Sequence, residues 1–199
     1  MSIYIALRDR RLAGGVPARS NLAIINTDEH TPLTRAFQAI NSVAQVGGGR
    51  KVRAMFIMCH GYAGQNQRAQ VSMDAGGMGL QLGRENVLHG NVSLWAAIKN
   101  RVENIVVYSC AASNTESGNE YTVADGRYLM GALAIVTNAS VFAADRIQWY
   151  STYKGLSNGR FEWGAWEGKL WHFPPSGGQP TQVLSAPVEF SNVMDGSAP

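Results

Sequence analysis

The sequence lacks the residues and motifs that define several large protein classes. It has only two cysteines, Cys59 and Cys110, too few for a disulfide scaffold or a four-cysteine zinc site. No apolar run reaches the roughly 18 residues of a membrane-spanning helix, and there is neither a G-x-G-x-x-G pattern nor a P-loop. The formal net charge is only +3, and the basic residues are scattered. We therefore expect no nucleic-acid partner and no membrane partner.

The first residues also lack the features of a leader peptide. The apolar stretch Met1–Leu7 precedes the charged run Arg8–Arg11, whereas a signal peptide carries its positive charge before its apolar segment. We therefore expect a cytoplasmic protein, or one exported without a cleaved signal peptide. The histidines lack the spacing of a metal site, and we expect neither a metal nor another cofactor.

The sequence does contain enough apolar residues for one folded domain. Of its 199 residues, 45% are hydrophobic and 16% are charged, a composition too apolar for a disordered chain. Residues 174–199 are rich in Pro, Gly and Ser. We interpret them as a C-terminal tail that follows a single domain over residues 1–173.

Short apolar runs without alternation indicate strands buried on both faces, as in a parallel sheet. They alternate with segments of helical periodicity that begin at capping residues. We expect strands at 2–7, 21–26, 52–59, 105–108 and 141–144, and helices that begin near Thr31, near Asn91 or Ser93, and at Asp125. The tryptophan-rich segment after them is typical of antiparallel or extended chain at a sheet edge. The sequence thus predicts an α/β fold, a mostly parallel sheet of about four to six strands with helices on both faces.

Reactive side chains follow two of these strands, at the edge of the sheet where α/β enzymes bind ligands. One strand ends in Cys59-His60-Gly61 and the next apolar strand ends before Cys110. A right-handed crossover puts the two strands side by side or one apart, so we expect His60 near Cys110. An imidazole beside a cysteine favours the thiolate and can protonate a leaving amine. The backbone N–H groups of Gly61 and Cys110 are the expected oxyanion donors.

A His-Gly pair after one apolar strand and a Cys after the next resembles clan CD of the cysteine peptidases, which includes caspases, metacaspases, gingipains and separases. Residues 22–26 are similar to the first core strand of the caspases, and the resemblance extends to Asp145. It implies a caspase-haemoglobinase-like fold and a protein or peptide substrate. It also implies that His60 acts as general base and acid and that Cys110 is the nucleophile. Ala112 stands where the caspases have glycine, so the chain departs from the caspases proper.

A different enzyme class is the first alternative. His60 and Gly61 begin a segment similar to the H-G-x-x-G oxyanion loop of α/β-hydrolases, and Asp145 and His172 follow Cys110 in the order nucleophile, acid, histidine. This pattern would give an esterase with a cysteine nucleophile. The bulky Tyr108, two residues before Cys110, argues against the tight turn that such enzymes need.

Two further alternatives concern inactive states of the site. The chain would be a non-catalytic caspase-like interaction module if the dyad has no activity. Cys59 and Cys110 would form a disulfide if both strands ended at one level. Because neighbouring strand residues point to opposite faces, we expect Cys59 to face away from His60 and to be buried filler.

Acidic residues near the expected site predict a preference for a basic side chain before the scissile bond. Asp145 follows the strand at 141–144, and a buried carboxylate there would bind a guanidinium. Asp28 and Asp74 are the other candidates for substrate binding. The alternative for Asp145 is a structural role, as a partner of Arg146 or as a turn cap.

Overall fold

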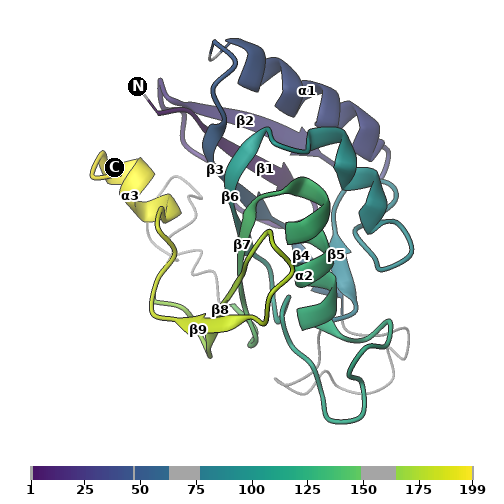
Figure 1. Cartoon of the computed structure of the whole chain (residues 1–199). Helices are drawn as coiled ribbons and strands as arrows, with labels where there is room; N and C mark the ends of the chain where they lie inside the picture. The colour runs from purple at the N-terminus through teal and green to yellow at the C-terminus, as the bar shows by residue number, and fades with distance from the viewer. Residues whose placement is uncertain (1, 47, 63–76, 149–164, 199) are drawn as a thin grey trace.

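The computed structural model describes residues 2–46, 48–62, 77–148 and 165–198. Within these ranges, seven strands form one sheet in the order β2-β1-β3-β6-β7-β8-β9 (Figure 1). Five strands are parallel: β1 (Tyr4–Asp9), β2 (Leu22–Thr27), β3 (Val52–Met58), β6 (Val102–Tyr108) and β7 (Ser140–Ala144). At one edge, β8 (Leu170–Phe173) and β9 (Thr181–Val183) add in antiparallel orientation. The α/β class and the mostly parallel sheet are confirmed, and the sheet is larger than expected. The antiparallel edge is confirmed for Leu170–Phe173, whereas residues 149–164 of the tryptophan-rich segment lie outside the described residues.

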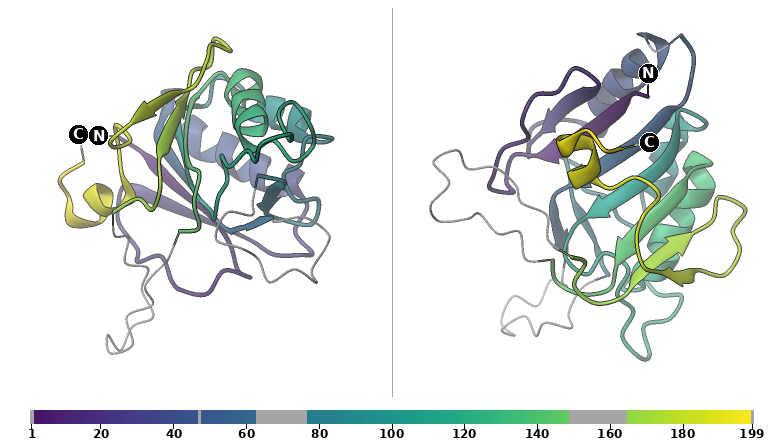
Figure 2. Two further views of the ribbon diagram at one scale, coloured as in Figure 1. Left: turned by 90° about the horizontal axis from the view of Figure 1, so that it is seen from below. Right: turned by 90° about the vertical axis from the view of Figure 1, so that its left-hand side faces the viewer.

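The helices lie mainly on one face of the sheet, as Figures 1 and 2 show. The connections from β2 to β3, β3 to β6 and β6 to β7 contain α1 (Leu33–Val46), the 3-10 helix η1 (Val92–Ile98) and α2 (Gly126–Thr137). All three connections step in the same direction across the sheet, and right-handed crossovers then put them on the same face. On the other face, the described chain has one helix, the six-residue α3 (Phe190–Asp195). The expected helices on both faces are therefore very unequal.

Alternating strand residues fill two separate cores. Ile5, Met55 and Ile105 are fully buried beneath α1, η1 and α2, whereas Phe56 and Val106 are fully buried on the side of α3. This alternation follows from the period of two along a strand. It also decides which reactive side chains reach which face at the carboxyl ends of the strands.

Two helix predictions had different outcomes. Asp125 caps α2 as expected, because its carboxylate accepts a hydrogen bond from the N–H of Tyr128 at 3.0 Å. The segment after Asn91 is a 3-10 helix and not the longer α-helix that the apolar spacing predicted. Its buried residues, Trp95 and Ile98, are three apart and therefore lie on one side of a helix with three residues per turn.

The C-terminal segment 174–198, which we interpreted as a tail, contributes strand β9, helix α3 and part of the core. Val188 and Phe190 have no exposed surface. The Phe190 ring packs edge-on against Phe56 with their centroids 5.4 Å apart, and its N–H donates to the hydroxyl of Tyr108. A few apolar residues among Pro, Gly and Ser are enough to attach this segment to the sheet. None of the helices in the described ranges is long and apolar enough to cross a bilayer.

Candidate active site

The two strands that end in reactive residues are direct neighbours. β3 pairs with β6, and Met58 lies opposite Tyr108 at the carboxyl end of both strands. One residue further on, the Sγ of Cys59 lies 3.9 Å from the Oγ of Ser109, beneath the helices. The chain then leaves the main sheet as β4 (His60–Tyr62), which pairs with β5 (Gly79–Gln81). The topology thus brings the His60-Gly61 and Cys110 segments together, as predicted.

Gly61 packs directly against the backbone of Cys110. A Cβ built on Gly61 would overlap the carbonyl oxygen of Cys110, so only glycine fits here. The backbones of Gly61 and of Cys110 itself both act to lower the pKa of the Cys110 thiol, as groups close to its sulfur do. The two backbone segments expected to supply the oxyanion donors are therefore adjacent, beside the sulfur atom that would attack the substrate.

Cys110 lies at the surface in a half-buried position. Burial raises the pKa of its thiol, while the nearby backbone of Gly61 acts in the opposite direction. The thiol donates to the carbonyl oxygen of Gln148 at 3.6 Å. The next residue, Ala111, has φ of +48°, a left-handed conformation that is strained for a residue with a Cβ. A raised thiol pKa means that Cys110 needs a base to become a nucleophile at neutral pH.

His60 has an exposed side chain that is anchored at one ring nitrogen. Its Nε2 lies 3.2 Å from the carbonyl oxygen of Arg11, in the turn after β1. Because a carbonyl oxygen only accepts, Nε2 carries the hydrogen, and in the neutral ring Nδ1 holds the lone pair. His60 is therefore held as the tautomer whose Nδ1 is able to accept a proton.

Cys59 is unsuited to chemistry. Its side chain has no exposed surface, and burial raises the pKa of its thiol from 9.0 to about 12. Both cysteines are free thiols, so the alternative of a disulfide between Cys59 and Cys110 is wrong for this structure.

The residues of the hydrolase alternative are not brought together. His172 lies on β8, where its ring stacks on Phe142 and its Nε2 lies 3.2 Å from the hydroxyl oxygen of Ser140, at the amino end of β7. The carboxylate of Asp145, at the opposite end of β7, accepts hydrogen bonds from the Lys169 N–H at 2.9 Å and from the indole N–H of Trp171 at 3.1 Å. Asp145 therefore does not orient His172.

Of the three acidic residues predicted to bind substrate, two accept hydrogen bonds within the protein and one lies outside the described residues. Both carboxylate oxygens of Asp145 accept hydrogen bonds from within the protein, from Lys169 and Trp171. Asp28 accepts from the N–H of His30 and the hydroxyl of Thr31, in the turn before α1. Asp74 lies outside the described residues.

Sequence reasoning missed three residues at the site. Arg11 and Gln148 act through their backbone carbonyls, which leave no signature in a sequence. Glu167 is the third, and the buried side chain of Gln148 holds the backbone of Glu167. The Gln148 amide donates to the Glu167 carbonyl at 2.9 Å and accepts from the Glu167 N–H at 3.3 Å. The negative charge of Glu167 adds to the raised pKa of Cys110.

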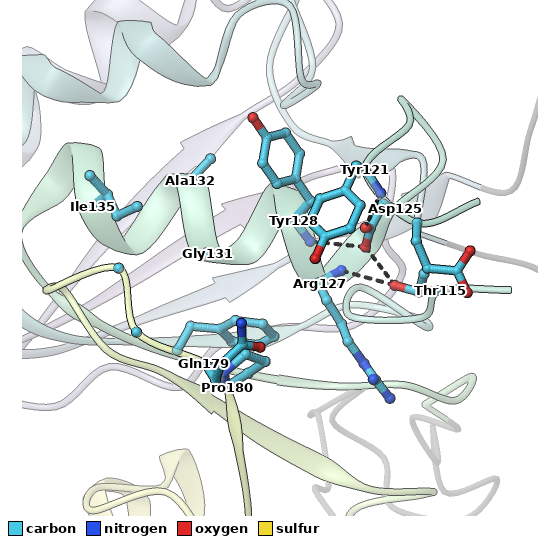
Figure 3. A pocket seen from close by; sticks show the side chains of 14 residues that line it. Thr115, Tyr121, Asp125, Arg127, Tyr128, Gly131, Ala132, Ile135, Gln179 and Pro180 are labelled. Atoms are coloured by element: carbon cyan, nitrogen blue, oxygen red, sulfur yellow. Dashed lines mark hydrogen bonds between the residues drawn. The ribbon is translucent and has the colours of Figure 1, made fainter. Parts of the chain in front are cut away.

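A separate cavity of about 490 Å³ lies between α2 and residues 177–180 (Figure 3). Rings and small residues line much of it, among them Tyr121, Tyr128, Gly131 and Pro180. At the edge of the cavity, the carboxylate of Asp125 accepts hydrogen bonds from the hydroxyl of Thr115 and from two backbone N–H groups. Neither His60 nor Cys110 lines this cavity.

Comparison with known proteins adds no relative. No family model, no curated protein and no solved structure matches the chain. In the described ranges, no group of three or more His, Cys, Asp or Glu side chains is arranged to hold a metal ion.

Proposed function

We propose that this protein is a cysteine endopeptidase with a caspase-haemoglobinase-like fold. His60 takes the thiol proton of Cys110, and the sulfur attacks the carbonyl carbon of the scissile peptide bond. The N–H groups of Gly61 and Cys110 bind the resulting oxyanion. Protonated His60 then gives its proton to the leaving amine, which leaves a thioester on Cys110. A water molecule, deprotonated by His60, hydrolyses this thioester and releases the new carboxylate.

The observation that carries the proposal is the close packing of Gly61 on Cys110. This contact requires glycine, and it packs the strand that begins at His60 against the backbone of Cys110. A buried structural cysteine needs none of these features, and Cys59 has none of them. The caspase-like assignment is supported by the positions of the His-Gly pair and the Cys at the ends of neighbouring parallel strands.

We further propose a preference for basic side chains before the scissile bond. Asp145 is a poor candidate for their recognition because its carboxylate is already bonded to Lys169 and Trp171. Glu167 is better suited, since it lies close enough to Cys110 to influence its pKa, and its backbone is fixed by Gln148. A carboxylate in that position would pair with a lysine or arginine side chain.

A peptide library assayed with the purified full chain tests this function. We expect cleavage after Lys or Arg, loss of cleavage in Cys110→Ala, and a loss of about 100-fold or more in His60→Gln. Cys59→Ala is the matched control and should keep its activity. Cleavage that survives Cys110→Ala would overturn the dyad, and cleavage mainly after acidic residues would overturn the specificity alone.

A further inference from the structure

An ion pair between the buried Asp9 and the partly exposed Arg11 lies in the turn that anchors His60. The side chain of Asp9, at the end of β1, has no exposed surface. It accepts two hydrogen bonds from the guanidinium of Arg11, at 2.7 and 2.8 Å, and a third from the backbone N–H of Arg11 at 3.1 Å. Asp9 thus holds Arg11 by its side chain and by its backbone at once. The carbonyl of this same Arg11 receives the Nε2 hydrogen of His60.

The same ion pair also reaches the strand that carries His60. The Asp9 carboxylate accepts from the N–H of Gly83 at 2.8 Å, and Arg11 donates to the Gly83 carbonyl at 2.9 Å. Gly83 follows β5, in which Gln81 lies opposite His60. The ring of His60 and its backbone are therefore both connected to the Asp9–Arg11 pair, by two separate routes.

Fold stability alone does not explain this arrangement. Charge burial by itself would raise the pKa of Asp9, yet the hydrogen bonds from Arg11 and Gly83 outweigh burial and lower it. Asp9 is therefore a carboxylate at neutral pH, with all of these bonds formed. A charged pair that fixes a backbone carbonyl costs desolvation, and a well-packed apolar pair would serve stability as well.

We propose that Asp9 is a positioning residue for the dyad, and that through Arg11 it fixes the ring orientation and tautomer of His60 at Cys110. The inference rests on the proposed function. Asp9 does not touch the substrate or the sulfur. Its removal should leave Cys110 in place while the base is no longer held in one orientation.

Two measurements on the full chain test this role. The first is the rate of Cys110 alkylation by iodoacetamide between pH 5 and 9, followed by peptide mass spectrometry. The second is the nitrogen NMR spectrum of the histidine rings, with His60 assigned by its loss in His60→Gln. In Asp9→Asn we expect alkylation at pH 7 to fall about tenfold, since a displaced base loses one to two orders of magnitude. We also expect the His60 signals to move towards a mixture of tautomers.

The control is Thr27→Val, which removes a bond to the same carboxylate, at 3.2 Å, without touching Arg11. It should change the alkylation rate by less than about twofold. Arg11→Lys, which keeps the charge but loses the paired donors, should behave as Asp9→Asn does, and Asp9→Glu should recover part of the rate. Arg11→Lys also provides the test if Asp9→Asn does not fold, as judged by circular dichroism.

Failure of this inference and failure of the proposed function give different results. If His60→Gln leaves the alkylation profile unchanged, the dyad itself is wrong, and the NMR spectrum of Asp9→Asn still decides whether Asp9 orients the ring. If His60→Gln slows alkylation but Asp9→Asn and Arg11→Lys change neither the rate nor the tautomer, the positioning role of Asp9 is overturned.

Discussion

The two cysteines follow neighbouring strands, β3 and β6, yet their thiols differ in burial. On the face covered by α1, η1 and α2, Cys59 is sealed in the core and its pKa is raised to about 12. Beyond the end of β6, Cys110 is only half-buried, and Gly61 packs against its backbone. Helix coverage thus seals one thiol in the core, while the other lies partly exposed at the end of the neighbouring strand. The predictions below test this contrast, from the largest expected effect to the smallest.

The largest effect should come from removal of the apolar anchor on the thinly covered face. Phe190 packs edge-on against Phe56 and has no exposed surface. Phe190→Ala should therefore lower the free energy of unfolding by about 3–5 kcal/mol. Leu184→Ala is the control, because that side chain is 95% exposed, and it should cost less than about 0.5 kcal/mol. Urea unfolding measures both, and equal losses would mean that the C-terminal segment does not belong to this core.

The second effect concerns the contact between the two strand ends. A Cβ at residue 61 overlaps the backbone of Cys110, so Gly61→Ala should push the His60 segment away from the sulfur. We expect peptidase activity to fall about 100-fold, as misplaced catalytic groups do. Gly90→Ala is the matched control, since a Cβ there meets nothing within 4 Å. The peptidase rates of the two variants should differ by that factor, and full activity in Gly61→Ala would contradict the proposed geometry.

The third effect is the pH dependence of stability that the buried Cys59 thiol should cause. Because the pKa of Cys59 is about 12 in the fold and near its ordinary 9.0 when unfolded, the unfolded state loses a proton more readily above pH 9. Stability from this group is thus complete below pH 9 and is lost as the pH rises towards 12. From pH 8 to 10 the wild type should lose about 1.4 kcal/mol more than Cys59→Ala. Identical pH dependence in urea unfolding of the two proteins would show that Cys59 is not sealed.

The smallest effect compares two glycines within α2. A Cβ on Gly131 meets only the ring of Phe173, at 4.0 Å, whereas a Cβ on Gly126 lies 2.6 Å from the Ala112 carbonyl oxygen. Gly131→Ala should therefore stabilise the fold by about 0.5–1 kcal/mol through helix propensity. Gly126→Ala should destabilise it, because the loop after Cys110 must move. Thermal unfolding of the two variants gives the comparison, and a destabilised Gly131→Ala would contradict the open space beside this helix.

The sequence was sufficient to predict features that repeat or alternate. The apolar runs predicted the parallel strands, and the period of two predicted that Cys59 and His60 face apart. The crossover rule predicted that the His60 and Cys110 strands lie side by side or one apart, and they lie side by side. These features depend on local pattern and on chain handedness, both of which can be derived from residue order.

Contacts made by backbone atoms in loops were not predictable in the same way. The carbonyls of Arg11 and Gln148 contact His60 and Cys110 whatever the side chains at positions 11 and 148 are, so no residue type marks them. The role of Asp9 depends on Gly83, which is far away in the sequence. Val188 and Phe190 were hidden in a segment whose average composition resembles a linker.

Covalent labelling with a peptidyl acyloxymethyl ketone tests the central claim most directly. Such a reagent bears a carbonyl for the oxyanion donors and forms a thioether with an activated cysteine. With arginine before its reactive carbon, it should modify the full chain once, and peptide mass spectrometry should locate the adduct on Cys110. His60→Gln should slow labelling by about 100-fold, and Cys59→Ala should leave it unchanged. Modification of Cys59, or equal labelling of the wild type and His60→Gln, would contradict the account.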